Sequence, residues 1–239
     1  MDQSSIAECI GAVKSDRLIT LNIGKVGALL SVQVQQAVLE AASPWFQKAL
    51  GDDRFVEGQS GVIAFPEDDT ESWKILLYWL LHRDVPMMED DATWKDYLNT
   101  LVKCWVLGDK YSVSKFQDEI MLLLIQYAYW SRASLQPAEY KKLIEITPAD
   151  SHLMRLLGEE VAVKYRKLSN LTREVANVLD GVEGFWPAFL EAQHGLMWKK
   201  CIFDDRLRGV DSNGLTTSHW QEYMVGELPS FEGCIGDRV

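Results

Sequence analysis

Short apolar runs bounded by glycine predict a small sheet in the first 65 residues. Residues 18–23 are rich in aliphatic and β-branched side chains and stop at a glycine, and residues 28–34 form a second such run. This composition is typical of strands, and the glycines between the two runs predict a hairpin. Residues 61–65, which lie between a glycine and a proline, predict a third strand.

Two helices are predicted between the second and third strands, over residues 36–50. Ser43 can cap the second helix with its side-chain oxygen, and Pro44 lacks only an N–H that the first turn does not use. This helix has one apolar stripe, formed by Trp45, Phe46, Ala49 and Leu50. Gly51 ends the helix, and a polar loop is expected before the third strand.

The middle of the chain carries three further helical patterns. The first follows an acidic turn at residues 67–69 and ends at residues 83–86. In the second, apolar side chains recur at helical spacing at Trp94, Leu98, Leu101, Val102 and Trp105. In the third, Ser114 and Gln117 have the spacing of a capping box.

Beyond residue 130 the apolar pattern is wholly helical. Four helices are predicted there, over residues 137–146, 150–168, 171–179 and 184–203. A short helix is also predicted near the start of the chain, over residues 4–13. From residue 204 on, glycine and polar residues dominate, so a loosely ordered tail is expected.

The composition argues against several classes of protein. The four cysteines are scattered without a C-x-x-C pair, so neither a disulfide framework nor a cysteine zinc site is indicated. No apolar run approaches the roughly 18 residues of a membrane span, and the first 15 residues lack a signal-peptide pattern. We therefore expect a soluble intracellular protein, cytoplasmic or nuclear, that makes no contact with membranes.

Charge is unevenly distributed along the 239 residues. The net charge of −11 disfavours direct nucleic-acid binding, because phosphate neutralisation needs clustered Lys and Arg. Residues 1–130 hold 11 Lys and Arg against 19 Asp and Glu, whereas residues 131–203 hold 10 against 9. We expect four segments: a leader at 1–15, an α+β domain at 16–130, an all-α extension at 131–203 and a tail at 204–239.

No motif indicates catalysis, a metal or a cofactor. None of the histidines lies at helical ligand spacing from another histidine or from a cysteine; they are His82, His152, His194 and His219. Residues 58–61 lack the form of a nucleophile elbow, and residues 24–27 lack that of a phosphate loop. Both stretches are interpreted as turns, and the chain is predicted not to be an enzyme.

Charged clusters have simple structural explanations. The acidic groups at residues 67–69 and 89–91 each precede a predicted helix, where negative charge is stabilising. One basic cluster consists of Lys164, Arg166, Lys167 and Arg173. It predicts a solvated helix face, and contact with an acidic partner surface remains the alternative.

Four stretches of the first 130 residues, taken in order, resemble the BTB/POZ domain. The sequence QQAVLEAASPWF at residues 35–46 resembles the helical signature V-H-K-x-x-L-x-x-x-S-x-x-F, and FVEG at residues 55–58 resembles F-x-E-G. Residues 63–69 correspond to the strand and acidic turn before the central helix, and VLGDKY at residues 106–111 resembles L-A-D-K-Y. The resemblance implies a small β-sheet capped by α-helices.

The helical half is similar to the extension of BTB proteins in filamentous fungi, through TPADSHLMRLL at residues 147–157. Two positions depart from the family pattern. Gln35 stands where a histidine is usual, and the aspartate expected before the first strand is displaced near Asp16. These positions line the corepressor pocket of BTB transcription factors, so the resemblance does not extend to that role. Residues 21–24 also resemble the tetramerising branch, and the oligomeric state stays open.

The resemblance implies partner contacts at Phe55 and Glu57, with Tyr111 beside them. In BTB adaptors, a hydrophobic-x-Glu element in this loop meets the helices of a cullin. An exposed aromatic side chain can fill a partner pocket while a neighbouring carboxylate fixes the register. The residues alone leave two alternatives open. Phe55 can fold back on the core, and Tyr111 can be a core tyrosine.

The expected function is therefore protein–protein interaction. In its most specific form the chain is a substrate adaptor for a cullin-type ubiquitin ligase, whose helical half or tail binds the client. The alternative is a homo-oligomeric BTB scaffold or regulatory protein without a ligase role, built on the N-terminal helix and first strands. A hydrolase with no recognisable motif is the remote third possibility.

Overall fold

The computed structural model describes residues 17–25, 27–51, 55–86, 94–131, 135–165, 173–198 and 220–226. The fold is of the mixed α+β class expected from the sequence. Contacts divide the chain into two compact units. The N-terminal unit comprises residues 1–86 and 107–113, and the helical unit comprises residues 87–106 and 114–239. The sequence-based boundary near residue 130 differs from this division and stays a prediction.

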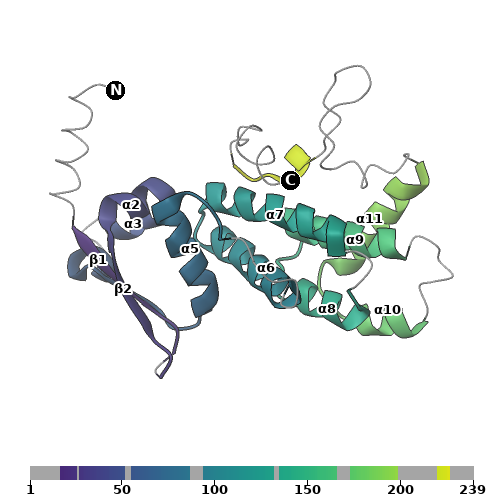
Figure 1. Cartoon of the computed structure of the whole chain (residues 1–239), viewed down its shortest axis with the longest axis horizontal. Coiled ribbons are helices and arrows are strands. Elements are labelled where there is room, and N and C mark those ends of the chain that lie inside the picture. The colour runs from purple at the N-terminus through teal and green to yellow at the C-terminus, as the bar shows by residue number, and fades with distance from the viewer. Residues whose placement is uncertain are drawn as a thin grey trace, which may run out of the picture. The chain divides into compact units, whose positions relative to one another are not determined.

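The N-terminal unit is built on a three-stranded sheet (Figure 1). Its strands are β1 (Leu18–Ile23), β2 (Leu30–Gln35) and β3 (Val62–Phe65), in the order β2-β1-β3. β1 and β2 pair antiparallel, with Ile19 opposite Val34, so the predicted hairpin is confirmed. β1 and β3 pair parallel, with Leu21 opposite Ile63. The parallel pairing requires a crossover connection, which the helices between β2 and β3 supply.

One face of the sheet is buried, as the alternation along β1 and β3 requires. The buried strand residues are Ile19, Leu21, Ile23, Val34, Ile63 and Phe65. The Phe65 ring lies 6.1 Å from the Trp45 ring and 4.5 Å from the Trp73 ring, measured between centroids. The buried face therefore shares its core with the helices that carry these tryptophans, α3 (Pro44–Gly51) and α5 (Thr70–His82).

Three of the four described helices of the N-terminal unit were predicted from the sequence, and one was not. The four are α2 (Gln36–Ala42), α3 (Pro44–Gly51), α4 (Val56–Ser60) and α5 (Thr70–His82). The Ser43 side chain accepts the backbone N–H of Trp45 at 3.0 Å, and the Asp69 side chain accepts that of Ser72 at 2.9 Å. Both are N-caps that satisfy otherwise unbonded donors. The one-turn helix α4 falls where a polar loop was expected.

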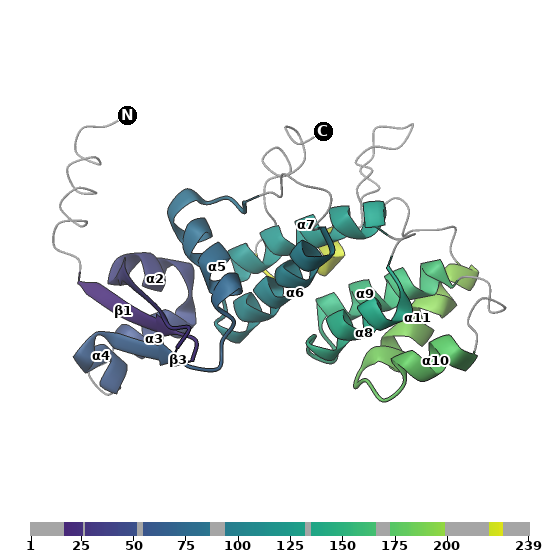
Figure 2. The ribbon, with the colours of Figure 1, turned by 60° about the horizontal axis from the view of Figure 1, so that its bottom comes forward.

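Six helices account for most of the remaining described residues (Figure 2). They are α6 (Trp94–Lys110), α7 (Ser114–Ser131), α8 (Pro137–Glu145), α9 (His152–Lys164), α10 (Arg173–Leu179) and α11 (Phe185–Trp198). Within the helical unit, α9 packs along α11 and α8 packs against both α9 and α10. A Cβ on Gly158 would lie 3.0 Å from the Ala188 Cβ, so glycine lets α9 and α11 approach closely.

A short segment of the expected tail is packed onto the helical unit. Residues Trp220–Tyr223 form a 3₁₀ helix that contacts α7 and α9. Trp220, Tyr223 and Met224 are all buried. The prediction of a loosely ordered tail is therefore wrong for residues 220–226, because their apolar side chains find a surface that periodicity alone does not reveal.

Two further predictions concern the start of the chain and membrane spans. The short helix predicted over residues 4–13 lies outside the described residues. Among the helices that the structure describes, none is long and apolar enough to cross a membrane.

Candidate protein-interaction site

The two residues before and at the start of α4 expose apolar side chains. Phe55 is 51% exposed and Val56 is 75% exposed. The alternative that Phe55 folds back on the core is thus not what the structure describes. An exposed aromatic next to an exposed aliphatic residue is a small apolar surface of the kind that anchors protein partners. We call Phe55 and Val56 the apolar pair.

The other end of α4 is held by an arginine. The Arg17 guanidinium donates from Nη1 to the Gly58 carbonyl at 2.6 Å and from Nη2 to the Gln59 carbonyl at 2.9 Å. These carbonyls lie in the last turn of the helix, where intrahelical donors are missing. The periodic pattern of apolar positions gave no signal for this contact, because it depends on where the chain folds back.

Gly61 completes the anchor of α4. Its φ of 67° is left-handed, its N–H donates to the Glu57 carbonyl at 2.9 Å, and its carbonyl accepts the Thr20 N–H at 2.8 Å. A Cβ at this glycine would lie 2.8 Å from Nη2 of Arg17. The apolar pair therefore projects from a turn that is fixed to β1.

Glu57 lies in the first turn of α4 and is half-buried. A carboxylate in this position interacts favourably with the N-terminal end of the helix dipole. It follows the apolar pair directly along the chain, so a partner that covers Phe55 would come close to it. Its role in partner binding stays a prediction.

Tyr111 does not belong to this surface. It is only 4% exposed, and its ring packs against those of Trp45, Phe46, Phe65 and Trp73. The alternative of a core tyrosine is therefore the correct one. A single aromatic residue just after a helix carries no periodic signal that separates a core position from a surface position.

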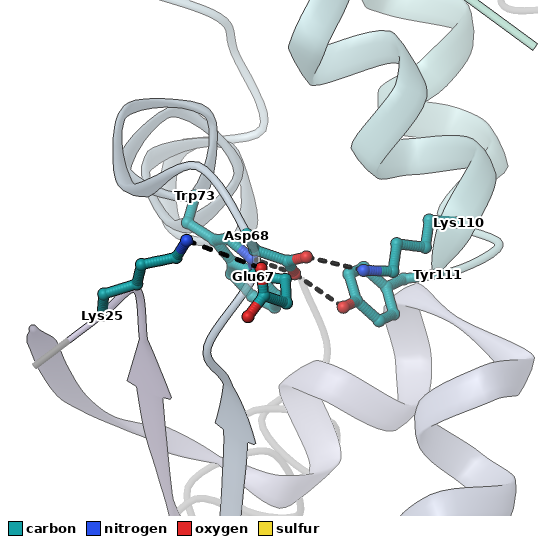
Figure 3. Close-up of polar contacts among 6 residues, drawn as sticks. All are labelled: Lys25, Glu67, Asp68, Trp73, Lys110 and Tyr111. Carbon is teal, nitrogen blue, oxygen red and sulfur yellow. Dashed lines mark hydrogen bonds and ion pairs between the residues drawn. The ribbon is translucent and has the colours of Figure 1, made fainter. Parts of the chain in front are cut away.

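The Tyr111 hydroxyl is held by the buried carboxylate of Asp68 (Figure 3). It donates to Oδ2 of Asp68 at 2.6 Å, and Nε1 of Trp73 donates to the same oxygen at 2.9 Å. The Lys110 ammonium donates to Oδ1 at 2.6 Å. The Asp68 side chain is only 6% exposed, so all three donors stabilise a desolvated charge.

Burial, reinforced by the hydrogen bond to Asp68 and by its negative charge, raises the pKa of Tyr111 well above its ordinary value. The phenol thus stays protonated and acts as a donor. Residues 67–69 were expected to serve helix initiation together. Asp69 does so as the N-cap of α5, whereas Asp68 joins distant parts of the unit. Glu67 forms only an exposed ion pair with Lys25 at 3.7 Å.

The opposite face of the sheet is open. Along β1 and β3 the positions that alternate with the core are exposed or half-buried, and they include Leu18 at 53% and Val62 at 41% exposure. Val62 pairs with Thr20, two residues beyond Leu18, so both apolar side chains lie on this face. The Ser31 hydroxyl donates to the Asn22 side-chain oxygen at 2.9 Å across the same face.

The prediction that the basic cluster forms a solvated helix face fits one of its two described residues and not the other. Lys164 is half-buried, donates to the Leu135 carbonyl and lies 5.6 Å from the centre of the Tyr140 ring. Burial lowers the pKa of this lysine. Arg173 is exposed, and Arg166 and Lys167 lie outside the described residues. The lysine is thus used within the helical unit.

Candidate metal ligands do not gather in the described part of the chain. No three His, Cys, Asp or Glu residues there are placed to share an ion. His219 and the acidic residues 89–91 lie outside the described residues. The expectations of a non-enzyme without metal or cofactor stay predictions.

Comparison with known proteins gives no relative from which a function could be transferred. No protein-family model matches the chain, and no curated protein matches it.

Proposed function

We propose that the chain is a non-enzymatic protein-interaction module of the BTB/POZ type. The order of elements supports this: a hairpin, two helices, a short helix, a strand parallel to the first, and a long helix. The stretches that resemble the family signature fall on α2, α3 and α4, and the acidic turn falls just before α5. Tyr111 of the segment VLGDKY packs under that turn through Asp68.

The exposed apolar pair is the observation that carries the proposal. Phe55 presents half of its surface to solvent although the unit has an extensive aromatic core in which it could be buried. The turn behind it is fixed by Arg17 and Gly61, so a partner would not have to order it. Preorganised aromatic anchors of this kind contribute a large share of the binding free energy in protein interfaces.

A cullin-type scaffold is the partner that the site fits best. The residues around the apolar pair belong to a stretch, residues 1–130, with 11 Lys and Arg against 19 Asp and Glu. The acidic balance of this stretch, together with Glu57 next to the apolar pair, favours a partner with an apolar pocket and a basic rim. In this arrangement Phe55 fills the pocket, Glu57 meets the basic rim, and the helical unit is left to bind a client for ubiquitin transfer.

Binding to a purified cullin N-terminal region tests the proposal. Substituting Phe55→Ala together with Glu57→Ala should weaken binding at least about a hundredfold, since hot-spot aromatics alone cost 2 kcal/mol or more. Leu81→Ala is the matched control, because Leu81 is a 72% exposed aliphatic residue in the same unit. Cullin binding that is equally strong in the double variant, with an unchanged melting curve, would sink the adaptor function.

Self-association is the second candidate, and the open face of the sheet favours it. Leu18 and Val62 would lie in an interface between two copies. Light scattering at micromolar concentration should then give a mass above that of one chain, and Val62→Lys should lower it to one chain. A wild-type chain that stays monomeric across this range contradicts self-association.

A further inference from the structure

Residues 220–226 lie on the helical unit as a bound peptide would. They begin 22 residues after the last residue of α11, and they contact α7 and α9, neither of which is adjacent to them in sequence. In a 3₁₀ helix, side chains three residues apart stand on the same side. Trp220 and Tyr223 therefore both face the helices, and they are 3% and 1% exposed.

An aspartate on α7 fixes the backbone of the segment. Asp118 accepts the Val225 N–H through Oδ1 at 2.6 Å and the Gly226 N–H through Oδ2 at 2.9 Å. It is itself only 1% exposed. A carboxylate that accepts two adjacent main-chain N–H groups makes two strong charge-assisted bonds and sets the direction of the bound chain.

A second polar contact lies at the other side of the segment. Arg155 on α9 donates to Glu159 at 3.0 Å and to Glu222 at 2.6 Å, and the Tyr223 hydroxyl donates to Glu159. The guanidinium also lies 5.0 Å from the centre of the Tyr223 ring. The buried carboxylate of Glu159 thus forms an ion pair with Arg155 of the same helix and accepts a hydrogen bond from the Tyr223 hydroxyl of the segment.

The site also selects for small size at one position. A Cβ on Gly226 would lie 2.9 Å from Oδ2 of Asp118 and 3.0 Å from Cβ of Ser114, so any larger residue would have to displace the carboxylate that holds the segment, and glycine is favoured. The neighbouring Val225 is 47% exposed, so the contact with the helices does not restrict the size of its side chain. The recognised pattern is thus Trp, Tyr and Gly at intervals of three residues.

We propose that this α7–α9 face is a peptide-recognition site, occupied in cis by residues 220–226, that binds a partner peptide of the same pattern. Every feature of the contact is one that a separate peptide could supply: two aromatic side chains, an acidic residue and two main-chain N–H groups. The cis segment then competes with the partner. The apparent affinity for the partner is the affinity of the uncovered face multiplied by the fraction of molecules in which the face is uncovered. The site lies within the helical unit and does not depend on a cullin.

Calorimetric titration of the full-length chain with a synthetic peptide tests the proposal. The peptide has the sequence of residues 220–226, with an acetylated N-terminus and an amidated C-terminus. In the chain, Trp220→Ala and Tyr223→Ala together release the cis segment. The released chain should bind the peptide saturably, and the wild-type chain should bind it at least about tenfold more weakly, because its face is covered.

Variants of the face and of the peptide test the recognition itself. Adding Asp118→Ala to the released chain should weaken binding at least about tenfold, since two charge-assisted hydrogen bonds are lost. A peptide with Gly226→Ala should bind clearly more weakly, whereas Val225→Ala is the matched control and should bind within about twofold of the parent, as exposed positions do. A scrambled peptide should not bind.

A second variant that releases the segment is needed in case the double alanine variant does not fold. Val225→Pro with Gly226→Pro removes both N–H groups that Asp118 accepts and leaves all side chains of α7 and α9 unchanged. If circular dichroism finds the alanine variant unfolded, the proline variant replaces it. Failure of the folded released chain to bind the peptide overturns the proposal, and so does binding that is indifferent to Asp118→Ala or to scrambling.

Discussion

A nearly buried aspartate organises each unit, and the two aspartates bind different kinds of donor. In the N-terminal unit, Asp68 accepts from the side chains of Trp73, Lys110 and Tyr111. In the helical unit, Asp118 accepts from the backbone of Val225 and Gly226. The donors of Asp68 belong to the folded framework itself, whereas those of Asp118 belong to a segment outside the helices.

This difference separates a bond that holds the fold from a bond that holds a ligand-like segment. The buried donors Trp73 and Tyr111 cannot leave Asp68 without disrupting the core around them. Main-chain donors on a terminal segment can leave Asp118 while the helices stay folded, and any peptide offers such donors. Losing the Asp68 contact should therefore lower global stability, whereas losing the Asp118 contact should open the segment alone.

Removing the Asp68 carboxylate should have the largest effect. Asp68→Ala leaves the donors of Trp73 and Tyr111 in a largely desolvated place, and we expect a loss of about 2–4 kcal/mol in the free energy of unfolding. Urea denaturation measures it. Glu67→Ala is the control: its ion pair with Lys25 is exposed, so its loss should cost less than about 0.5 kcal/mol. Equal effects of the two substitutions would contradict the framework role of Asp68.

Tyr111→Phe should have the next largest effect, about 1–2 kcal/mol at neutral pH, since one hydrogen bond to a charged group is lost. Its effect should also depend on pH. The pKa of Tyr111 is raised in the folded state, so the folded form holds its proton above pH 10 while the unfolded form releases it. The contribution of Tyr111 is therefore full below about pH 10 and is lost as pH rises beyond it.

Denaturation curves from pH 7 to 11 check this dependence. The wild-type chain should lose more stability than the Tyr111→Phe chain above pH 10. Tyr78→Phe serves as the control, because Tyr78 is 40% exposed. A Tyr111→Phe chain with the same alkaline loss as the wild type would show that other groups cause it.

Asp118→Ala should have a smaller and local effect. The two main-chain N–H groups that lose Asp118 lie on a segment that can open to water, so they are not left desolvated and we expect a change of less than about 1 kcal/mol in the global free energy of unfolding. Amide hydrogen exchange at Val225 and Gly226 should nevertheless become faster by an order of magnitude or more. A global loss as large as that of Asp68→Ala would erase the distinction between the two aspartates.

Phe55→Ala should have the smallest effect on stability. Half of the side chain is already in water, so we expect less than about 1 kcal/mol in thermal unfolding. Phe46→Ala is the comparison, since Phe46 is 1% exposed and its truncation should cost about 3–5 kcal/mol. A large loss from Phe55→Ala would mean that this side chain serves the core rather than a partner.

The sequence predicted the elements whose signals are local. Ser43 and Asp69 are caps whose side-chain chemistry specifies a helix start, and the apolar runs of β1 and β3 end at glycine or proline. The burial of Phe65 and Trp73 agrees with the alternation along β3 and the periodicity of α5. Such features depend on neighbouring residues and are present in the sequence itself.

Features that depend on distant contacts were missed. The role of Asp68 depends on Tyr111, 43 positions away, and its place in an acidic cluster suggested only helix initiation. Residues 220–226 stand in a glycine-rich polar stretch, and the one available signal was the three-residue spacing of Trp220 and Tyr223. Tyr111 was placed on the surface by family resemblance, whereas its burial depends on the aromatic rings around it.

The parallel pairing of β1 with β3 has a consequence for the order of folding. Leu21 and Ile63 are opposite each other, so this pairing closes a loop of about 40 residues, which is slower than forming the neighbouring hairpin. The Arg17 contacts to Gly58 and Gln59 and the bond from Thr20 to Gly61 require that closure. The turn that carries Phe55 and Val56 is therefore fixed late, and a nascent chain presents the apolar pair in its final place only after the sheet is complete.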